Sequence, residues 1–222
     1  MLKAAIFDMD GVIVNSEPLH RKAYYSMFQE AGIEVPEELY DSFTGKSTIN
    51  ICRQLRERFN TSQTAEEVVQ IKRSFYNIIF ENDKTFDLIK GVRSLIQNYY
   101  KNGLTLVLAS SSSMLNIDRI FDRFNLNQYF KDKISGADLA ASKPDPEIFL
   151  KAVESTGFSA EECMIIEDAT NGIEAAKSAG IFCVGFNSTE TKNQDYSKAD
   201  LVIDNFESIH FQKISNIFQT VN

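Results

Sequence analysis

The chain has 222 residues, of which 43% are hydrophobic and 24% charged, a composition typical of a globular protein with one main core and room for an inserted lobe. Its net charge of −8, without a Lys/Arg run, argues against a partner bound through a nucleic-acid backbone. The cysteines Cys52, Cys163 and Cys183 show no CxxC spacing, so we expect buried thiols in a reducing compartment. With no signal-peptide pattern and no membrane-length apolar run, we expect a cytoplasmic protein without membrane contact.

Short apolar segments that end in polar residues recur along the chain, with helical stretches between them. The segments with the length of a buried strand are residues 4–7, 104–109, 164–166, 181–184 and 201–203. Crossover helices are expected at residues 91–101, 114–124, 146–154 and 171–179, and a last helix at 206–218. This alternation predicts an α/β domain with a largely parallel sheet flanked by helices.

Residues 17–87 break this alternation, because they contain no convincing strand pattern. Their apolar residues recur at helical spacing in three sets, Leu19/Ala23/Met27, Ile49/Cys52/Leu55/Phe59 and Val68/Ile71/Phe75/Ile78. Each set predicts a packing stripe along one helix. We therefore expect an all-helical lobe, residues 17–87, inserted into a core made of residues 1–16 and 88–222.

The first predicted strand runs into Asp8-Met9-Asp10-Gly11. Because side chains alternate along a strand, Asp8 and Asp10 lie on the same side, close enough to share a metal ion and a substrate. Gly11 allows the chain to turn sharply away from the sheet. An acidic turn without catalytic function has the same pattern, so this segment alone leaves both interpretations open.

Two later strands also end in polar residues. Residues 104–109 precede Ser110-Ser111-Ser112-Ser113, whose hydroxyls and N–H groups at a helix start either bind a phosphate or only cap the helix. Residues 164–166 precede Glu167-Asp168, two carboxylates that are either solvated or neutralised by a cation such as Mg²⁺. Since ligands of open parallel sheets bind beyond the carboxyl ends of the strands, we expect these groups at one site.

A lysine precedes the helix at residues 146–154, in the segment Ser142-Lys143-Pro144-Asp145-Pro146. Pro144 favours an extended Lys143. Asp145 and Pro146 match the N-cap and the first residue of the next helix. Lys143 is either an ordinary surface lysine or a cation within reach of a phosphate and of the carboxylate pair.

Taken together and in this order, four motifs resemble those of the haloacid dehalogenase-like hydrolase superfamily, over essentially the whole chain. They are Asp8-Met9-Asp10-Gly11-Val12, Ser110, Lys143 and Glu167-Asp168. Residues 142–146 and 166–180 are most similar to the branch of β-phosphoglucomutases and small sugar-phosphate phosphatases. The resemblance implies a Rossmann-like core, with residues 17–87 as the helical cap of the family's first subgroup.

The resemblance and the requirements of phosphoryl transfer agree on the chemistry. Asp8 would be the nucleophile that forms an aspartyl-phosphate, and Asp10 the general acid and base. Asp10 also favours P–O over C–halogen cleavage, because the dehalogenases of this family lack an aspartate two residues after the nucleophile. Ser110 and Lys143 would hold the phosphoryl oxygens.

The implied cofactor is Mg²⁺, bound by Asp8, the Asp10 carbonyl and Asp168, with Glu167 as a direct or indirect ligand. The expected substrate is a small phosphorylated metabolite, a hexose or pentose phosphate above all. Residues expected to contact the substrate, besides those above, are His20, Lys46, Lys72, Ser111, Ser112 and Asn171. We expect a monomer or a weak homo-oligomer.

Two activities are compatible with these motifs. His20 and Lys72 match a histidine and a lysine in the cap of the sugar phosphomutases, although both could be solvated helix residues. The mutases also carry an arginine after a Gly-x-Ser, whereas here Gly45-Lys46-Ser47 is followed by Thr48. A hydroxyl does not replace a guanidinium fork, which favours a phosphomonoesterase over a phosphomutase. A metal- or phosphate-binding module without turnover is the further alternative.

Overall fold

The computed structural model describes residues 1–43, 47–137, 139–188 and 193–221. The chain divides into two compact units, the core unit of residues 1–15 and 88–222 and the helical unit of residues 16–87. No helix in the described part of the chain is long and apolar enough to span a membrane.

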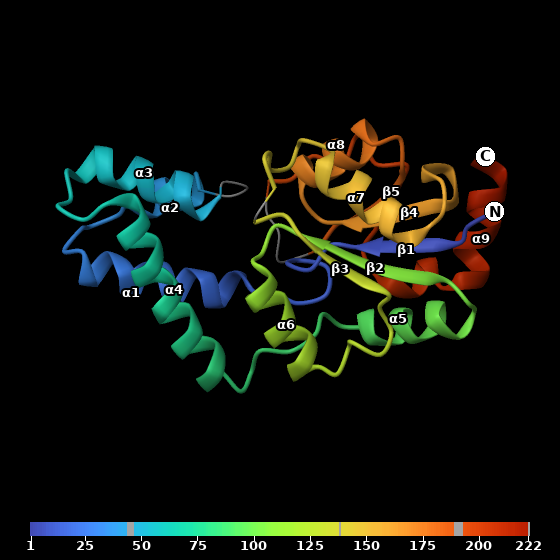
Figure 1. Cartoon of the computed structure of the whole chain (residues 1–222), viewed down its shortest axis with the longest axis horizontal. Coiled ribbons are helices and arrows are strands. Elements are labelled where there is room, and N and C mark those ends of the chain that lie inside the picture. The colour runs from blue at the N-terminus through green and yellow to red at the C-terminus, as the bar shows by residue number, and fades with distance from the viewer. Residues whose placement is uncertain (44–46, 138, 189–192, 222) are drawn as a thin grey trace. The chain divides into compact units, whose positions relative to one another are not determined.

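Within the described residues, the core unit contains a parallel sheet of six strands in the order β3-β2-β1-β4-β5-β6 (Figure 1). The strands are β1 (Ala4–Phe7), β2 (Thr105–Ser110), β3 (Asp132–Ser135), β4 (Cys163–Glu167), β5 (Phe182–Phe186) and β6 (Leu201–Ile203). Strand β1 pairs with β2 on one side and with β4 on the other, Phe7 lying opposite Leu108 and Ile166. The chain order reverses at β1, so the carboxyl end of β1 is the switch point where such sheets bind ligands.

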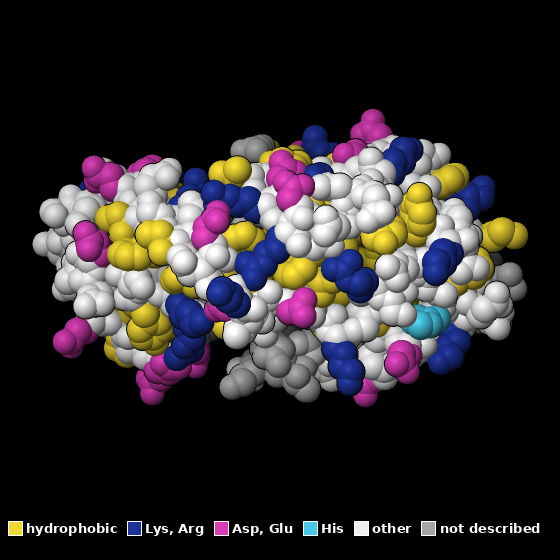
Figure 2. All heavy atoms as spheres, turned by 90° about the horizontal axis from the view of Figure 1, so that it is seen from below, with side chains coloured by type: hydrophobic (Ala, Val, Ile, Leu, Met, Phe, Trp, Pro, Cys, Tyr) yellow, Lys and Arg dark blue, Asp and Glu magenta, His cyan; other side chains and the backbone are white. Residues whose placement is uncertain are grey.

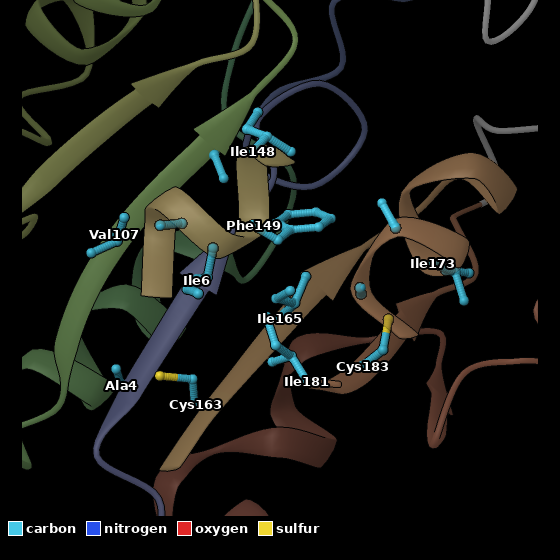
Figure 3. Packing of buried hydrophobic residues seen from close by; sticks show 14 residues of the cluster. Ala4, Ile6, Val107, Ile148, Phe149, Cys163, Ile165, Ile173, Ile181 and Cys183 are labelled. Carbon is cyan, nitrogen blue, oxygen red and sulfur yellow. The ribbon is translucent and has the colours of Figure 1, made fainter. Parts of the chain in front are cut away.

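Helices cover both faces of this sheet (Figure 1). Helices α7 (Glu147–Thr156) and α8 (Thr170–Ser178) lie on one face, and α5 (Val92–Lys101), α6 (Met114–Arg123) and α9 (Phe211–Val221) on the other. Short 3₁₀ turns, η1 (Ala160–Glu162) and η2 (Phe206–Ile209), precede β4 and α9. Figure 3 shows the packing beneath α7 and α8, where Ile6, Ile165 and Phe149 belong to one buried cluster. Both faces of the sheet are therefore shielded from water, which explains why the predicted strands are apolar at consecutive positions.

The expected α/β fold with a parallel sheet is confirmed, and the predicted strands and crossover helices lie within one or two residues of the observed ones. The pattern missed β3, because this edge strand has the polar sequence Asp-Lys-Ile-Ser and is only partly buried. The prediction of one continuous last helix at residues 206–218 was also wrong. The turn η2 and the helix α9 are separate, with His210 between them in an extended conformation.

The helical unit consists, in its described residues, of α1 (Glu17–Glu30), α2 (Glu37–Asp41), α3 (Thr48–Phe59) and α4 (Ala65–Asn82). They enclose a separate core, in which Met27, Cys52 and Leu55 are fully or almost fully buried. The predicted stripe of α4 packs on this core except at its last member: Val68 is buried, Ile71 and Phe75 are partly buried against the cluster, and Ile78 is 59% exposed. Helix α4 also buries Tyr76 and Phe80, so it has apolar residues on more than one side.

Candidate active site

The polar ends of three neighbouring strands meet in the core unit. Asp8 follows β1, Ser110 ends β2 and Glu167 ends β4, and the backbone N–H of Asp8 donates to the carbonyl of Ile166 at 3.0 Å. Parallel pairing places these three residues at the same edge of the sheet. The structure thus brings together side chains that lie up to 159 residues apart in the sequence.

Lys143 links the carboxylates at the ends of β1 and β4. Its Nζ donates to Asp8 Oδ1 at 2.6 Å and to Glu167 Oε1 at 2.7 Å, and its side chain is only 6% exposed. The lysine lies in a turn before α7, and its peptide bond to Pro144 is cis. Helix α7 begins one residue later than expected, at Glu147, whose N–H donates to the Asp145 carboxylate at 2.9 Å. Lys143 is therefore a buried cation and not an ordinary surface lysine.

Burial and neighbouring charges oppose each other at this cluster. The pKa of Asp8 is raised from 3.8 to about 7, chiefly by burial; Lys143 lowers this pKa, and Glu167 and Asp10 contribute to raising it. Burial by itself would lower the pKa of Lys143, but the two carboxylates outweigh it and hold that pKa above its usual range. One buried ammonium thus serves two buried carboxylates, which leaves the cluster with an excess of negative charge at high pH.

The loop after β1 brings Asp168 against the nucleophile segment. Gly11 has a φ of 88°, and a Cβ at this position would lie 2.0 Å from Asp168 Oδ2. Only glycine provides both the left-handed conformation and the space for this carboxylate. The Met9 carbonyl closes the loop by accepting from the N–H groups of Ile13 at 2.8 Å and Val14 at 3.0 Å.

The serine segment contacts Asp10. Ser112 Oγ donates to Asp10 Oδ2 at 2.9 Å, and the N–H of Ser112 donates to Ser110 Oγ at 3.1 Å. Ser110 is buried at the end of β2, whereas Ser111 is exposed. Ser135 of β3 holds the segment in place by donating to the Ser112 carbonyl at 2.8 Å. No sequence pattern indicated Ser135, because the strand that carries it, β3, was itself not predicted.

Both oxygens of the Glu167 carboxylate are bound by protein donors. Oε1 accepts from Lys143, and Oε2 accepts from the backbone N–H of Ala169 at 2.9 Å. The carboxylate packs against Gly172, where a Cβ would lie 1.8 Å from Oε1. Asn171, an expected substrate contact, lies beside this glycine in the first turn of α8 and is partly buried.

The loop from Asp168 to Thr170 is held by a segment that no sequence pattern indicated. Tyr196 donates its hydroxyl hydrogen to the Asp168 carbonyl at 3.0 Å. Gln194 Oε1 accepts from the N–H of Thr170 at 2.8 Å and from its hydroxyl at 3.0 Å. These residues lie between β5 and β6, far from every motif in the sequence, so only the tertiary structure reveals them.

In the helical unit, two of the expected substrate contacts meet. Lys72 Nζ lies 2.7 Å from His20 Nδ1, and the His20 ring is stacked on Tyr76 with 4.6 Å between the ring centroids. Burial, followed by the positive charge of Lys72, holds the pKa of His20 well below its usual range, so His20 is neutral and its Nδ1 accepts a hydrogen bond from the Lys72 ammonium. Lys46, the third expected contact, lies outside the described residues.

The oxygen donors of the core unit fit a hard divalent cation. No three His, Cys, Asp or Glu side chains of the described residues form a ready ligand set. Mg²⁺, however, is commonly held by one or two carboxylates, with water and phosphate oxygens completing the octahedron. Asp8 and Asp168 flank the same loop, where Glu167 and Asp10 add to a surplus of negative charge and, after burial, help to raise the pKa of Asp8. A cation would relieve this surplus.

A parallel sheet with two aspartates after its central strand, and a buried lysine between that strand and its neighbour, is the arrangement of a phosphoryl-transfer hydrolase. The family model of the haloacid dehalogenase-like hydrolases matches residues 5–186. The chain therefore belongs to the haloacid dehalogenase-like hydrolase family.

Individual relatives refine this assignment. A phosphorylated carbohydrates phosphatase of Thermotoga maritima is 31% identical over 185 residues, which are 81% of this chain and 82% of the relative. A β-phosphoglucomutase of Bacillus subtilis is 30% identical over 207 residues, 91% of this chain and 89% of the relative. The crystal structure of a β-phosphoglucomutase from Clostridium difficile has a TM-score of 0.84 at 27% identity and covers 100% of this chain and 99% of that chain. The expected family and branch are confirmed, as is the expectation of an enzyme.

Proposed function

We propose that this chain is a Mg²⁺-dependent phosphomonoesterase that hydrolyses a small sugar phosphate through an aspartyl-phosphate on Asp8. The observation that supports this most directly is the buried contact of Asp8 with Lys143, at 2.6 Å, at the switch point of the sheet. Lys143 orients this buried carboxylate and opposes the effect of burial on its pKa, which favours the ionised form that a nucleophile needs.

In the first half-reaction, an Asp8 carboxylate oxygen attacks phosphorus and the bond from phosphorus to the sugar oxygen breaks. The Asp10 carboxyl gives its proton to the departing alkoxide, which leaves as an alcohol. Ser112, whose hydroxyl contacts Asp10 at 2.9 Å, orients that carboxyl. Lys143 and the hydroxyl of Ser110 stabilise the charge on the phosphoryl oxygens.

In the second half-reaction, the Asp10 carboxylate takes a proton from water while the water oxygen attacks phosphorus. The bond between phosphorus and Asp8 breaks, inorganic phosphate leaves, and both aspartates return to their starting states. Glu167 acts through Lys143, because both of its oxygens are already bound by protein donors.

Asp8, Asp168 and the Asp10 carbonyl would hold Mg²⁺. When bound, the ion supplies positive charge to the phosphoryl group and to the crowded carboxylates. Tyr196 supports this donor set indirectly, since its hydroxyl holds the backbone of Asp168 at 3.0 Å.

A sugar phosphate is proposed as the substrate because the Thermotoga relative is named a phosphorylated carbohydrates phosphatase. The helical unit would supply the selecting groups His20, Lys72 and Lys46. With a net charge of −8, the chain is unsuited to nucleic acid, and a small ester held by local cations is the fitting partner.

The first experiment is phosphate release from p-nitrophenyl phosphate and from a panel of sugar phosphates, with and without Mg²⁺. We expect turnover that depends on Mg²⁺ and a loss of at least about 10³-fold in Asp8→Asn, because the amide cannot act as the nucleophile. Asp132→Asn, an exposed aspartate of β3, is the matched control and should keep full activity. Full activity of Asp8→Asn would rule out the nucleophile.

A sugar phosphomutase is the second candidate, and two observations favour it. The Bacillus relative, named a β-phosphoglucomutase, is 30% identical, and His20 contacts Lys72, the two residues that match the cap histidine and lysine of the mutases. Incubation with β-glucose 1-phosphate and a bisphosphate primer separates the candidates. The phosphatase proposal requires free phosphate to form faster than glucose 6-phosphate, and the reverse order would establish the mutase.

A further inference from the structure

The ammonium group of Lys143 has a neighbour that is not a hydrogen-bond acceptor. Its Nζ lies 4.7 Å from the centroid of the Phe149 ring, over the ring face. The same Nζ is 2.6 Å from Asp8, 2.7 Å from Glu167 and 3.5 Å from the Ala109 carbonyl oxygen. Three acceptors match the three N–H bonds of an ammonium, and the ring adds the negative potential of its π face.

Burial strengthens the attraction between the Lys143 ammonium and the Phe149 ring. The Lys143 side chain is 6% exposed and Phe149 is 0% exposed, so water does not screen the ammonium from the ring. Cation–π attraction is several times stronger in such a dry setting than at an exposed site. A buried ammonium also needs every favourable neighbour, because its transfer from water is costly.

The ring is fixed while the lysine is carried by a loop. Phe149 lies in the first turn of α7 and packs with Ile6 of β1 and Ile165 of β4 in the cluster of Figure 3. Lys143 belongs to the loop before that helix. Contact with a ring anchored in the core therefore restricts where the ammonium can lie.

We propose that Phe149 is a positioning residue for Lys143, whose ring face holds the ammonium against Asp8 and Glu167. The contact itself is independent of the activity, whereas its value for catalysis rests on the proposed function. Its only sequence signature is a phenylalanine six residues after the lysine, which reads as an ordinary core residue.

Stepwise fluorination of the Phe149 ring tests this proposal with little change in shape. Fluorine atoms withdraw the negative potential from the ring face but leave a buried apolar ring of nearly the same size. We expect the free energy of unfolding to fall steadily from mono- to trifluorophenylalanine at residue 149. In a Lys143→Met background, the same series should have no such slope. Equal slopes in the two backgrounds would overturn the proposal.

A second fluorination series, at Phe206, tests the proposal even if the Lys143→Met variant does not fold. Phe206 is 1% exposed and stacks on Phe186, and within the described residues no cation lies over its ring. Fluorination at Phe206 should leave the stability nearly constant, whereas fluorination at Phe149 should lower it in steps. An equal loss at both positions would mean that Phe149 only fills space.

The activity of the Phe149 series is the last measurement. We expect kcat/KM for the best ester to fall about tenfold across the series, in proportion to the lost ring potential. Unchanged kcat/KM alongside a clear coupling to Lys143 in the stability cycle would overturn the positioning role. If no ester is turned over by the unaltered enzyme, the proposed function fails, while the stability cycle still decides the contact.

Discussion

At the residue scale, the cluster of Asp8, Glu167 and Lys143 combines strong contacts with a net electrostatic cost. Two carboxylates share one ammonium in the interior, and the raised pKa of Asp8 shows that the cation does not fully compensate for burial. Catalytic sites commonly contain such destabilising arrangements of charge, since groups that bind a charged substrate must be present before it arrives.

Asp8 should make the stability of the metal-free protein fall with rising pH. Its pKa is about 7 in the folded protein against an ordinary 3.8, so the folded chain binds more protons than the unfolded chain between these values. Stability from this group is therefore highest below 3.8 and is lost as the pH rises to about 7. Asp8→Asn does not titrate, and its melting temperature relative to the unaltered protein should increase from pH 5 to pH 8.

This comparison is made by thermal unfolding in buffer without divalent ions. Addition of Mg²⁺ should reduce the difference at pH 8, because the cation stabilises the ionised Asp8. A difference that is the same at pH 5 and pH 8 would contradict the raised pKa.

A second residue-scale prediction concerns the space around Glu167. In Gly172→Ala the new Cβ would lie 1.8 Å from Glu167 Oε1, so the carboxylate must leave its place beside Lys143. We expect the fold to persist, because alanine is about 1 kcal/mol better than glycine in a helix. Phosphate release should fall at least about tenfold, an effect of more than about 1.4 kcal/mol on the transition state.

Ser178→Ala, at the exposed end of the same helix, is the control for general effects on α8. Full activity of Gly172→Ala would show that Glu167 is not needed to hold Lys143.

At the scale of elements, side-chain bonds to backbone groups join segments that the sheet does not pair. Tyr99 of α5 is fully buried and donates its hydroxyl hydrogen to the Ile209 carbonyl of η2 at 2.6 Å. This bond ties the first crossover helix to the turn before α9, more than 100 residues later. It explains why the last predicted helix divides, since Ile209 is held by α5 rather than continuing into α9.

Tyr99→Phe should therefore destabilise the core unit without affecting the chemistry. It leaves a buried carbonyl without its donor, at a cost of about 1–3 kcal/mol. The free energy of unfolding by urea should decrease by that amount, with kcat unchanged. Tyr100→Phe is the matched control, because Tyr100 is 51% exposed. A loss of kcat in Tyr99→Phe would indicate that this bond supports the active site.

At the scale of the whole molecule, each of the two compact units has a hydrophobic cluster of its own among the described residues. The core unit buries the sheet between helices, and the helical unit encloses its own cluster around Met27, Cys52 and Leu55. Separate cores allow the two units to unfold with different free energies.

Leu55→Ala should expose this difference. Leu55 is 2% exposed in the helical unit, and truncation of such a leucine costs about 2–5 kcal/mol. Hydrogen exchange of amides in α3 and α4 should accelerate strongly, while exchange in β1 and β4 changes little. Leu115→Ala, at a leucine of α6 that is 64% exposed, serves as the control. Equal acceleration in both units would mean that they unfold together.

The parallel sheet could be predicted from the sequence alone, and the sequence also predicts a helical insertion and four polar motifs at strand or helix boundaries. These follow from local physics: fully buried strands are apolar throughout, and catalytic groups stand at strand ends where the chain must turn. The family match to residues 5–186 agrees with that prediction.

The groups that hold the motifs in place can be recognised only in the folded structure. Phe149, Tyr196 and Ser135 have no pattern of their own, because their role depends on contacts across the fold. The same is true of Lys143, which the sequence left as either a surface residue or a buried cation. Its burial between Asp8 and Glu167 depends on the pairing of β1 with β4, whose partners are 159 residues apart.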